Sequence, residues 1–98
     1  MNESRIYVDF NEMPSEHEVV LSKGDSKPDS TGRFVHFVEG MHIAVYMDDE
    51  DKNGKPDNLV AEGVACLNHY KDWAAGPRWL LKISKRGIRH ESDDQRSE

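Results

Sequence analysis

The sequence contains very little cysteine and no long apolar run. Its single cysteine, Cys66, excludes an internal disulfide and is typical of a protein in a reducing compartment. No segment approaches the roughly 18 consecutive apolar residues that a membrane-spanning helix needs. The first ten residues have no basic segment followed by an apolar one, so they do not resemble a signal peptide. These absences predict a cytoplasmic protein that does not bind a membrane.

The patterns that usually carry catalysis are missing as well. There is no glycine-rich phosphate loop, no serine at a nucleophile elbow and no carboxylate pair that we can assign as acid and base. Cys66 lies in an apolar run, Val-Ala-Cys-Leu, which favours a small buried side chain over a nucleophile. Cys66 and His69 have the spacing of half a zinc site, but a structural site needs four ligands and the chain has no second cysteine. We therefore expect a non-catalytic domain without a cofactor.

The composition of the 98 residues fits one small domain. Although 36% of the residues are hydrophobic and 33% are charged, the aromatic and β-branched residues gather in short runs typical of strands. The formal net charge of −6 disfavours non-specific binding to nucleic acid, which depends on neutralising phosphates. Basic residues still concentrate between positions 78 and 90, at Arg78, Lys82, Lys85, Arg86 and Arg89. This basic segment either balances acids elsewhere in the molecule, which we favour, or forms a nucleic-acid surface.

The hydrophobic pattern predicts mostly β-strands. Apolar residues alternate with others over residues 6–10, 41–47 and 79–83, and the apolar runs at 18–22, 33–38 and 59–67 are also expected to be strands. The dipeptide Arg86-Gly87 predicts a turn into a short return strand from Ile88. Residues 22–32 are dense in Gly, Pro, Asp and Ser, and they predict a long loop. Residues 67–76 are expected to be a loop, with a short helix near 67–75 as the alternative.

Short strands separated by turn signals are typical of a small barrel. The expected fold class is mainly β, a five- to six-stranded barrel or roll with long polar loops. Residues 33–67 combine a glycine turn, an alternating strand, a polar tip and a return strand that contains Gly63, and this pattern resembles the central hairpin of SH3-like barrels. Gly63 itself predicts a bulge or a close backbone approach. We expect one domain over residues 1–90 and a disordered charged tail over 91–98.

The acidic segment between the two central strands has the spacing of a calcium loop. Calcium prefers six to eight oxygen ligands, and Asp49, Asp51, Asn53 and Asp57 fall at the alternate positions that supply them in an EF-hand loop. The position that should carry a bidentate glutamate is Val60, however. We therefore favour an ordinary solvated turn, with a weak calcium site as the alternative.

Aromatic and basic side chains in the last third of the chain are the candidates for partner binding. Trp79 belongs to an alternating apolar face and is expected in the core, whereas Tyr70 and Trp73 are candidates for an exposed patch together with Arg86 and Arg89. The sequence thus predicts an acidic, non-catalytic module that binds another protein. A calcium-binding domain and a nucleic-acid module through residues 78–90 are the alternatives.

Overall fold

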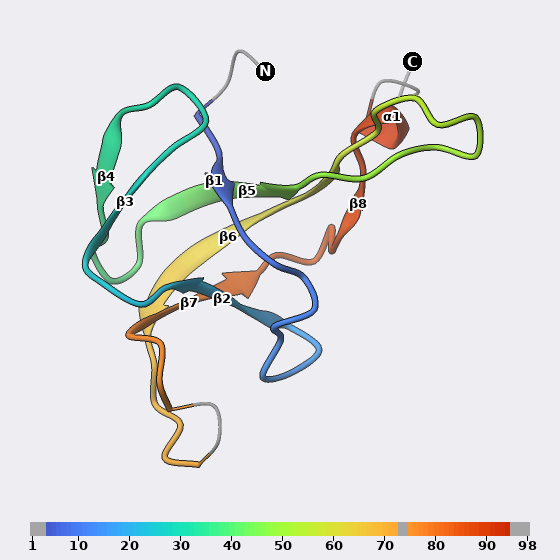
Figure 1. Ribbon diagram of the computed structural model, residues 1–98. Coiled ribbons are helices and arrows are strands. Elements are labelled where there is room, and N and C mark those ends of the chain that lie inside the picture. Colours follow the sequence, from blue (N-terminus) through green and yellow to red (C-terminus); the bar gives the residue numbers. More distant parts are fainter. Residues whose placement is uncertain (1–3, 73–74, 95–98) are drawn as a thin grey trace.

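The computed structural model describes residues 4–72 and 75–94, and in this part of the chain the fold is mainly β, as predicted (Figure 1). It contains eight short strands and one helical turn. These elements are β1 (Ile6–Tyr7), β2 (Glu18–Ser22), β3 (Ser26–Pro28), β4 (Phe34–His36), β5 (His42–Met47), β6 (Leu59–Leu67), β7 (Trp79–Ile83), β8 (Arg89–His90) and α1 (Glu91–Asp94).

Six of the strands form one sheet, and the other two form a separate hairpin. The order in the large sheet is β1-β5-β6-β7-β2, with β8 beside the first residues of β6. All of its pairings are antiparallel except that of β1 with β5. The sheet curls into a half-barrel, and the β3–β4 hairpin lies at its open side (Figure 1). A small β-rich curled sheet is confirmed, but the SH3-like arrangement is not.

The central strand of this sheet is β6. It pairs with β5 on one side and with β7 on the other, and Gly63 lies where all three strands meet. A Cβ atom on Gly63 would lie 2.0 Å from the carbonyl oxygen of Lys82 in β7. The close backbone approach that the sequence predicted at Gly63 is therefore present, and only glycine fits there.

The core lies on the concave face of the sheet, where the predicted alternation is confirmed. Ile43 and Val45 are buried while His42 is exposed, and Trp79 is only 5% exposed. Leu80 is also fully buried although it belongs to the opposite face of β7, beside Val20 and Cys66. The core consists of the following buried side chains: Ile6, Val8, Val19, Leu21, Phe37, Ile43, Val45, Ala61, Ala65, Trp79, Leu81 and Ile83.

Several expectations about connections need correction. The predicted loop 22–32 contains strand β3, because its Ser-Lys-Pro segment pairs with β4 in spite of the proline. The return strand after Gly87 pairs with β6 and not with β7. By contrast, the described residues between 67 and 76 contain no helix, in agreement with the loop that the sequence favoured there. Residues 91–94 form α1, not the start of an unstructured tail, and its Ser92 bonds Asp57.

Helices contribute almost nothing to this fold. The one helix among the described residues, α1, has four residues, far fewer than a helix needs to cross a membrane.

Candidate binding surface on the β3–β4 hairpin

A buried carboxylate shapes the turn of the β3–β4 hairpin. Asp29 accepts hydrogen bonds from the backbone N–H groups of Thr31 and Arg33, at 2.8 and 3.1 Å, and from the hydroxyl of Ser4 at 2.5 Å. The hydroxyls of Ser4 and Thr31 hold the pKa of Asp29 well below its usual range. Gly32, with a φ of 90°, completes a three-residue hairpin loop that requires a left-handed residue. The sequence Asp-Ser-Thr-Gly thus encodes a tight turn.

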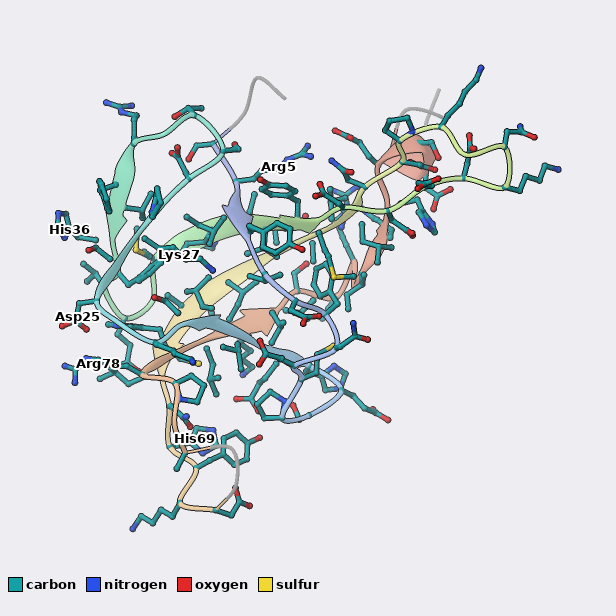
Figure 2. The ribbon with its side chains drawn as sticks, in the orientation of Figure 1. Arg5, Asp25, Lys27, His36, His69 and Arg78 are labelled. Atoms are coloured by element: carbon teal, nitrogen blue, oxygen red, sulfur yellow. The ribbon has the colours of Figure 1, made fainter. Side chains whose placement is uncertain are left out.

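Three side chains fix the inner side of the hairpin to the half-barrel. Phe37 is buried and packs against Trp79, with ring centroids 6.0 Å apart. The indole N–H of Trp79 donates to the carboxylate of Asp25 at 2.9 Å. Lys27 extends its ammonium group to the carbonyl oxygens of Tyr7 and Leu21, at 2.6 and 3.3 Å (Figure 2). Burial lowers the pKa of Lys27, since the ammonium group loses water. Apolar packing and hydrogen bonds therefore attach the hairpin to the half-barrel.

The outer side of the hairpin exposes apolar side chains to solvent. Phe34 is 67% exposed and Val38 is 62% exposed, more than any other large hydrophobic residue that the structure describes. His36, between them, is also exposed and points away from the molecule (Figure 2). Because side chains alternate along a strand, burying Val35 and Phe37 forces Phe34, His36 and Val38 outward. We call Phe34, His36 and Val38 the outer strip.

The backbone of β4 has an open edge beside this outer strip. Hydrogen bonds from Phe37 to Asp25 and from Asp29 to Arg33 mark the bonded positions of the hairpin. The register therefore makes Lys27 and Val35 the bonded pair between them, and it leaves Phe34 and His36 at non-bonded positions. The N–H and C=O groups of Phe34 and His36 thus point away from β3. Among the described residues no strand pairs with this side of β4.

Three other edge strands, β1, β2 and β3, have features that make them less open to pairing than β4. The carbonyl of Arg5, next to β1, accepts a bond from Ser30, and the N–H of Val20 in β2 donates to Glu12. The outer edge of β3 contains Pro28, which has no N–H to offer. Natural sheets protect edges by such means because an open edge pairs readily with another chain. By contrast, β4 lies at the outer margin of the molecule (Figure 1) without a proline or lysine.

A small hollow lies on the inner side of the hairpin. It has a volume of about 300 Å³ and is bordered by Ile6, Val35, Met41 and Ile43. This volume is at the lower limit of known small-molecule sites. We assign it no ligand.

The residues of the predicted calcium loop do not converge on one point. Asp51 accepts hydrogen bonds from the N–H groups of Asn53 and Lys55 in its own loop, at 2.8 and 3.0 Å. Gly54, with a φ of 81°, supplies the left-handed residue of the turn. Within residues 4–72 and 75–94 no three His, Cys, Asp or Glu side chains are grouped so as to hold a metal ion. Asp51 and Gly54 thus make the local contacts of a tight turn.

Two further carboxylates of this loop bind the C-terminal segment instead. Asp49 lies 2.8 Å from the Nε2 atom of His90, and Asp57 accepts the hydroxyl of Ser92 at 2.7 Å. The hydrogen bond with Asp49 raises the pKa of His90, while the bond with His90 lowers the pKa of Asp49. An open polar cleft of about 680 Å³ separates the loop from α1. These contacts explain why α1 is ordered beside the loop.

The predicted aromatic and basic binding residues are engaged within the molecule or lie outside the described part. The hydroxyl of Tyr70 donates to Glu18 at 2.5 Å, whereas Trp73 lies outside the described residues. Burial alone would raise the pKa of Glu18, but the hydrogen bonds from Tyr70 and others lower it on balance. Arg89 and Arg86 both contact the carboxylate of Glu62, at 2.8 and 3.5 Å.

Charge compensation within the molecule extends to the other end of the basic segment. Arg78 pairs with the carboxylate of Asp25 at the base of the hairpin (Figure 2). Together with the pairs of Arg86 and Arg89, this gives three of the five basic side chains between positions 78 and 90 an acidic partner.

Cys66 is half-buried, and burial raises the pKa of its thiol.

No protein-family model matches this sequence, and comparisons with curated proteins and with solved structures likewise give no match. The outer strip was missed as a candidate site, although residues 33–38 were expected to be a strand and its apolar residues occupy both odd and even positions. That two-sided pattern was the available signal, because a hairpin with only one buried face leaves the other set exposed.

Proposed function

We propose that this chain is a non-catalytic protein-interaction module of the SH3-like small-barrel type, which binds an extended segment of a partner protein along β4. The observation that carries the proposal is the open backbone edge of β4 beside the outer strip. Extended peptides commonly bind by adding a strand to such an edge, where the backbone gives affinity and alternate side chains give specificity. A cytoplasmic location is part of the proposal, since the single cysteine fits a reducing compartment.

The size of the surface sets the expected affinity. Covering Phe34 and Val38, each about two-thirds exposed, contributes on the order of 2–4 kcal/mol. The N–H and C=O groups of Phe34 and His36 add up to four backbone hydrogen bonds, each worth roughly 0.5–1.5 kcal/mol net. Since association costs at least about 4 kcal/mol, a single short peptide is expected to bind with a Kd of about 0.1–1 mM. Tighter binding requires contacts beyond β4.

A selection from random peptides displayed in many copies per particle tests this function, because multivalency compensates for weak single sites. We expect enrichment of β-prone sequences with apolar residues at every second position. The selected peptides should shift the amide resonances of Phe34 and His36 in the wild-type protein. The variant Phe34→Ser should lose binding, while Leu67→Ser, which removes an exposed apolar side chain elsewhere, should keep it.

A variant of the backbone separates strand addition from simple apolar contact. In His36→Pro the outward N–H group is removed while the hairpin bond of Val35 is kept, since proline is tolerated where the N–H faces solvent. Peptides that bind by strand addition should lose affinity for this variant. Peptide binding that is unaffected by His36→Pro, or that maps to another surface, would refute the proposal.

No second function is proposed. The backbone of the acidic loop satisfies Asp51, and Arg78, Arg86 and Arg89 each contact an acidic side chain.

A further inference from the structure

We propose that β4 also pairs with β4 of a second copy of this chain, so that the protein forms a weak antiparallel dimer about a two-fold axis near Val35. This inference rests on the proposed function, because it uses the same open edge. The occupant is a second copy since the hydrogen-bonding groups, the charges and the side chains of this edge are each complementary to themselves.

The open backbone groups match in an antiparallel arrangement. Phe34 and His36 each present one N–H and one C=O on the outer edge of β4. If Phe34 pairs with His36 of the second copy, the two residues exchange both hydrogen bonds. The two-fold axis repeats this exchange, and all four groups on each chain are then used. The open edge of β4 does not extend to Val38, because the N–H and C=O groups of Val38 already bond Met41 in the following turn.

The charges at the ends of β4 also favour an antiparallel dimer. Arg33 precedes the strand and Glu39 follows it, and both residues are exposed. Antiparallel pairing brings the Arg33 end of one copy to the Glu39 end of the other, so opposite charges meet at both ends. In a parallel pairing, like charges would lie beside each other. The charge pattern therefore selects the same orientation as the hydrogen bonds.

The side chains of the outer strip gain cover in this arrangement. Phe34 of each copy lies across from His36 of the other on the outer face, which shields the phenyl ring from water. Strands of three residues bury much less than the roughly 800 Å² per partner of a standard stable interface. The dimer is consequently weak, and a binding partner at sufficient concentration displaces the second copy from the edge.

Sedimentation velocity over about 10 µM to 1 mM protein, where so small an interface is expected to associate, tests the dimer. The wild-type protein should sediment faster as its concentration rises, and a mixture of isotope-labelled and unlabelled chains should show contacts between Phe34 and His36 of different copies. His36→Pro should remain a monomer. Leu67→Ser should associate like the wild type.

A charge exchange keeps the test independent of whether the proline variant folds. Arg33→Glu and Glu39→Arg should each weaken association, because each places like charges together. The double variant R33E/E39R should restore it, since the ends are again complementary. Rescue of this kind is not expected if either substitution merely disturbs the fold.

The outcomes separate this inference from the proposed function. A wild-type protein that stays monomeric to about 1 mM but binds peptides at β4 overturns the dimer and leaves the function standing. A dimer that persists in both His36→Pro and Arg33→Glu uses another surface, which also overturns the inference. A protein that neither associates nor selects peptides at β4 refutes both proposals.

Discussion

Gly63 offers the most severe single test of how the sheet is packed. A Cβ atom at this position would lie 2.0 Å from the carbonyl oxygen of Lys82, 2.8 Å from its carbonyl carbon and 3.1 Å from Cα of Ile83. All three atoms belong to the backbone of β7, so no side chain can turn aside. Because Cβ atoms essentially never approach closer than 3.0 Å, Gly63→Ala must separate β6 from β7 by about 1 Å.

The cost of this separation is large for so small a protein. Overpacking a core commonly costs about 1–3 kcal/mol, and here hydrogen bonds of the β6–β7 ladder are lost as well. We therefore expect Gly63→Ala to lower the free energy of unfolding by roughly 3–5 kcal/mol, a large part of the 5–15 kcal/mol typical of a domain.

Urea unfolding followed by tryptophan fluorescence and far-ultraviolet circular dichroism measures this loss. Gly24→Ala is the matched control, because nothing lies within 4 Å of its Cβ and its φ is not left-handed. It should leave stability unchanged or raise it by up to about 1 kcal/mol. If Gly63→Ala proves as stable as Gly24→Ala, the close contact between β6 and β7 is wrong.

Three other predictions concern the core and the acidic loop. Val45→Ala should cost about 1–3 kcal/mol in urea unfolding, since Val45 is fully buried, and His42→Ala on the exposed face much less; reversed costs would contradict the register. The hydrogen bond with Asp49 raises the pKa of His90 above the ordinary histidine value of about 6.5. The stabilisation from this contact is therefore fully present below about pH 6.5, and it is lost as the pH rises through the raised pKa. Amide exchange in α1, corrected for intrinsic rates, should therefore be slower at lower pH, and His90→Gln should abolish this difference. Calcium and magnesium should shift the Gly54 amide equally and slightly; a saturable, calcium-selective shift would restore the ion-binding alternative.

The sequence was sufficient to predict the main strands, because their alternation follows directly from burial of one face. Ile43, Val45, Trp79 and Leu81 all lie in the core where the pattern placed them. The paired strand β3 was not predictable in this way, since its sequence Ser-Lys-Pro contains no apolar residue to bury. The turn at Asp29 brings it against β4, and the contacts of Lys27 with Tyr7 and Leu21 attach it to the half-barrel.

The candidate site was harder to predict than the fold. Tyr70, Arg86 and Arg89 are residue types enriched at interfaces, but here Tyr70 bonds Glu18 and both arginines contact Glu62. Such partners come from distant parts of the chain, so local composition does not reveal them. The open edge of β4 depends on which strands fail to pair with it, and that is a property of the whole topology.

Amide hydrogen exchange along β4 tests the central claim most directly. In the dilute protein, the Val35 and Phe37 amides, which bond β3 and Asp25, should exchange slowly, and those of Phe34 and His36, which face outward, should exchange fast. A peptide selected for binding should slow exchange at Phe34 and His36 while Val35 and Phe37 stay as they were. Protection of Phe34 and His36 in the dilute protein, or no change there when the peptide binds, would contradict strand addition at β4.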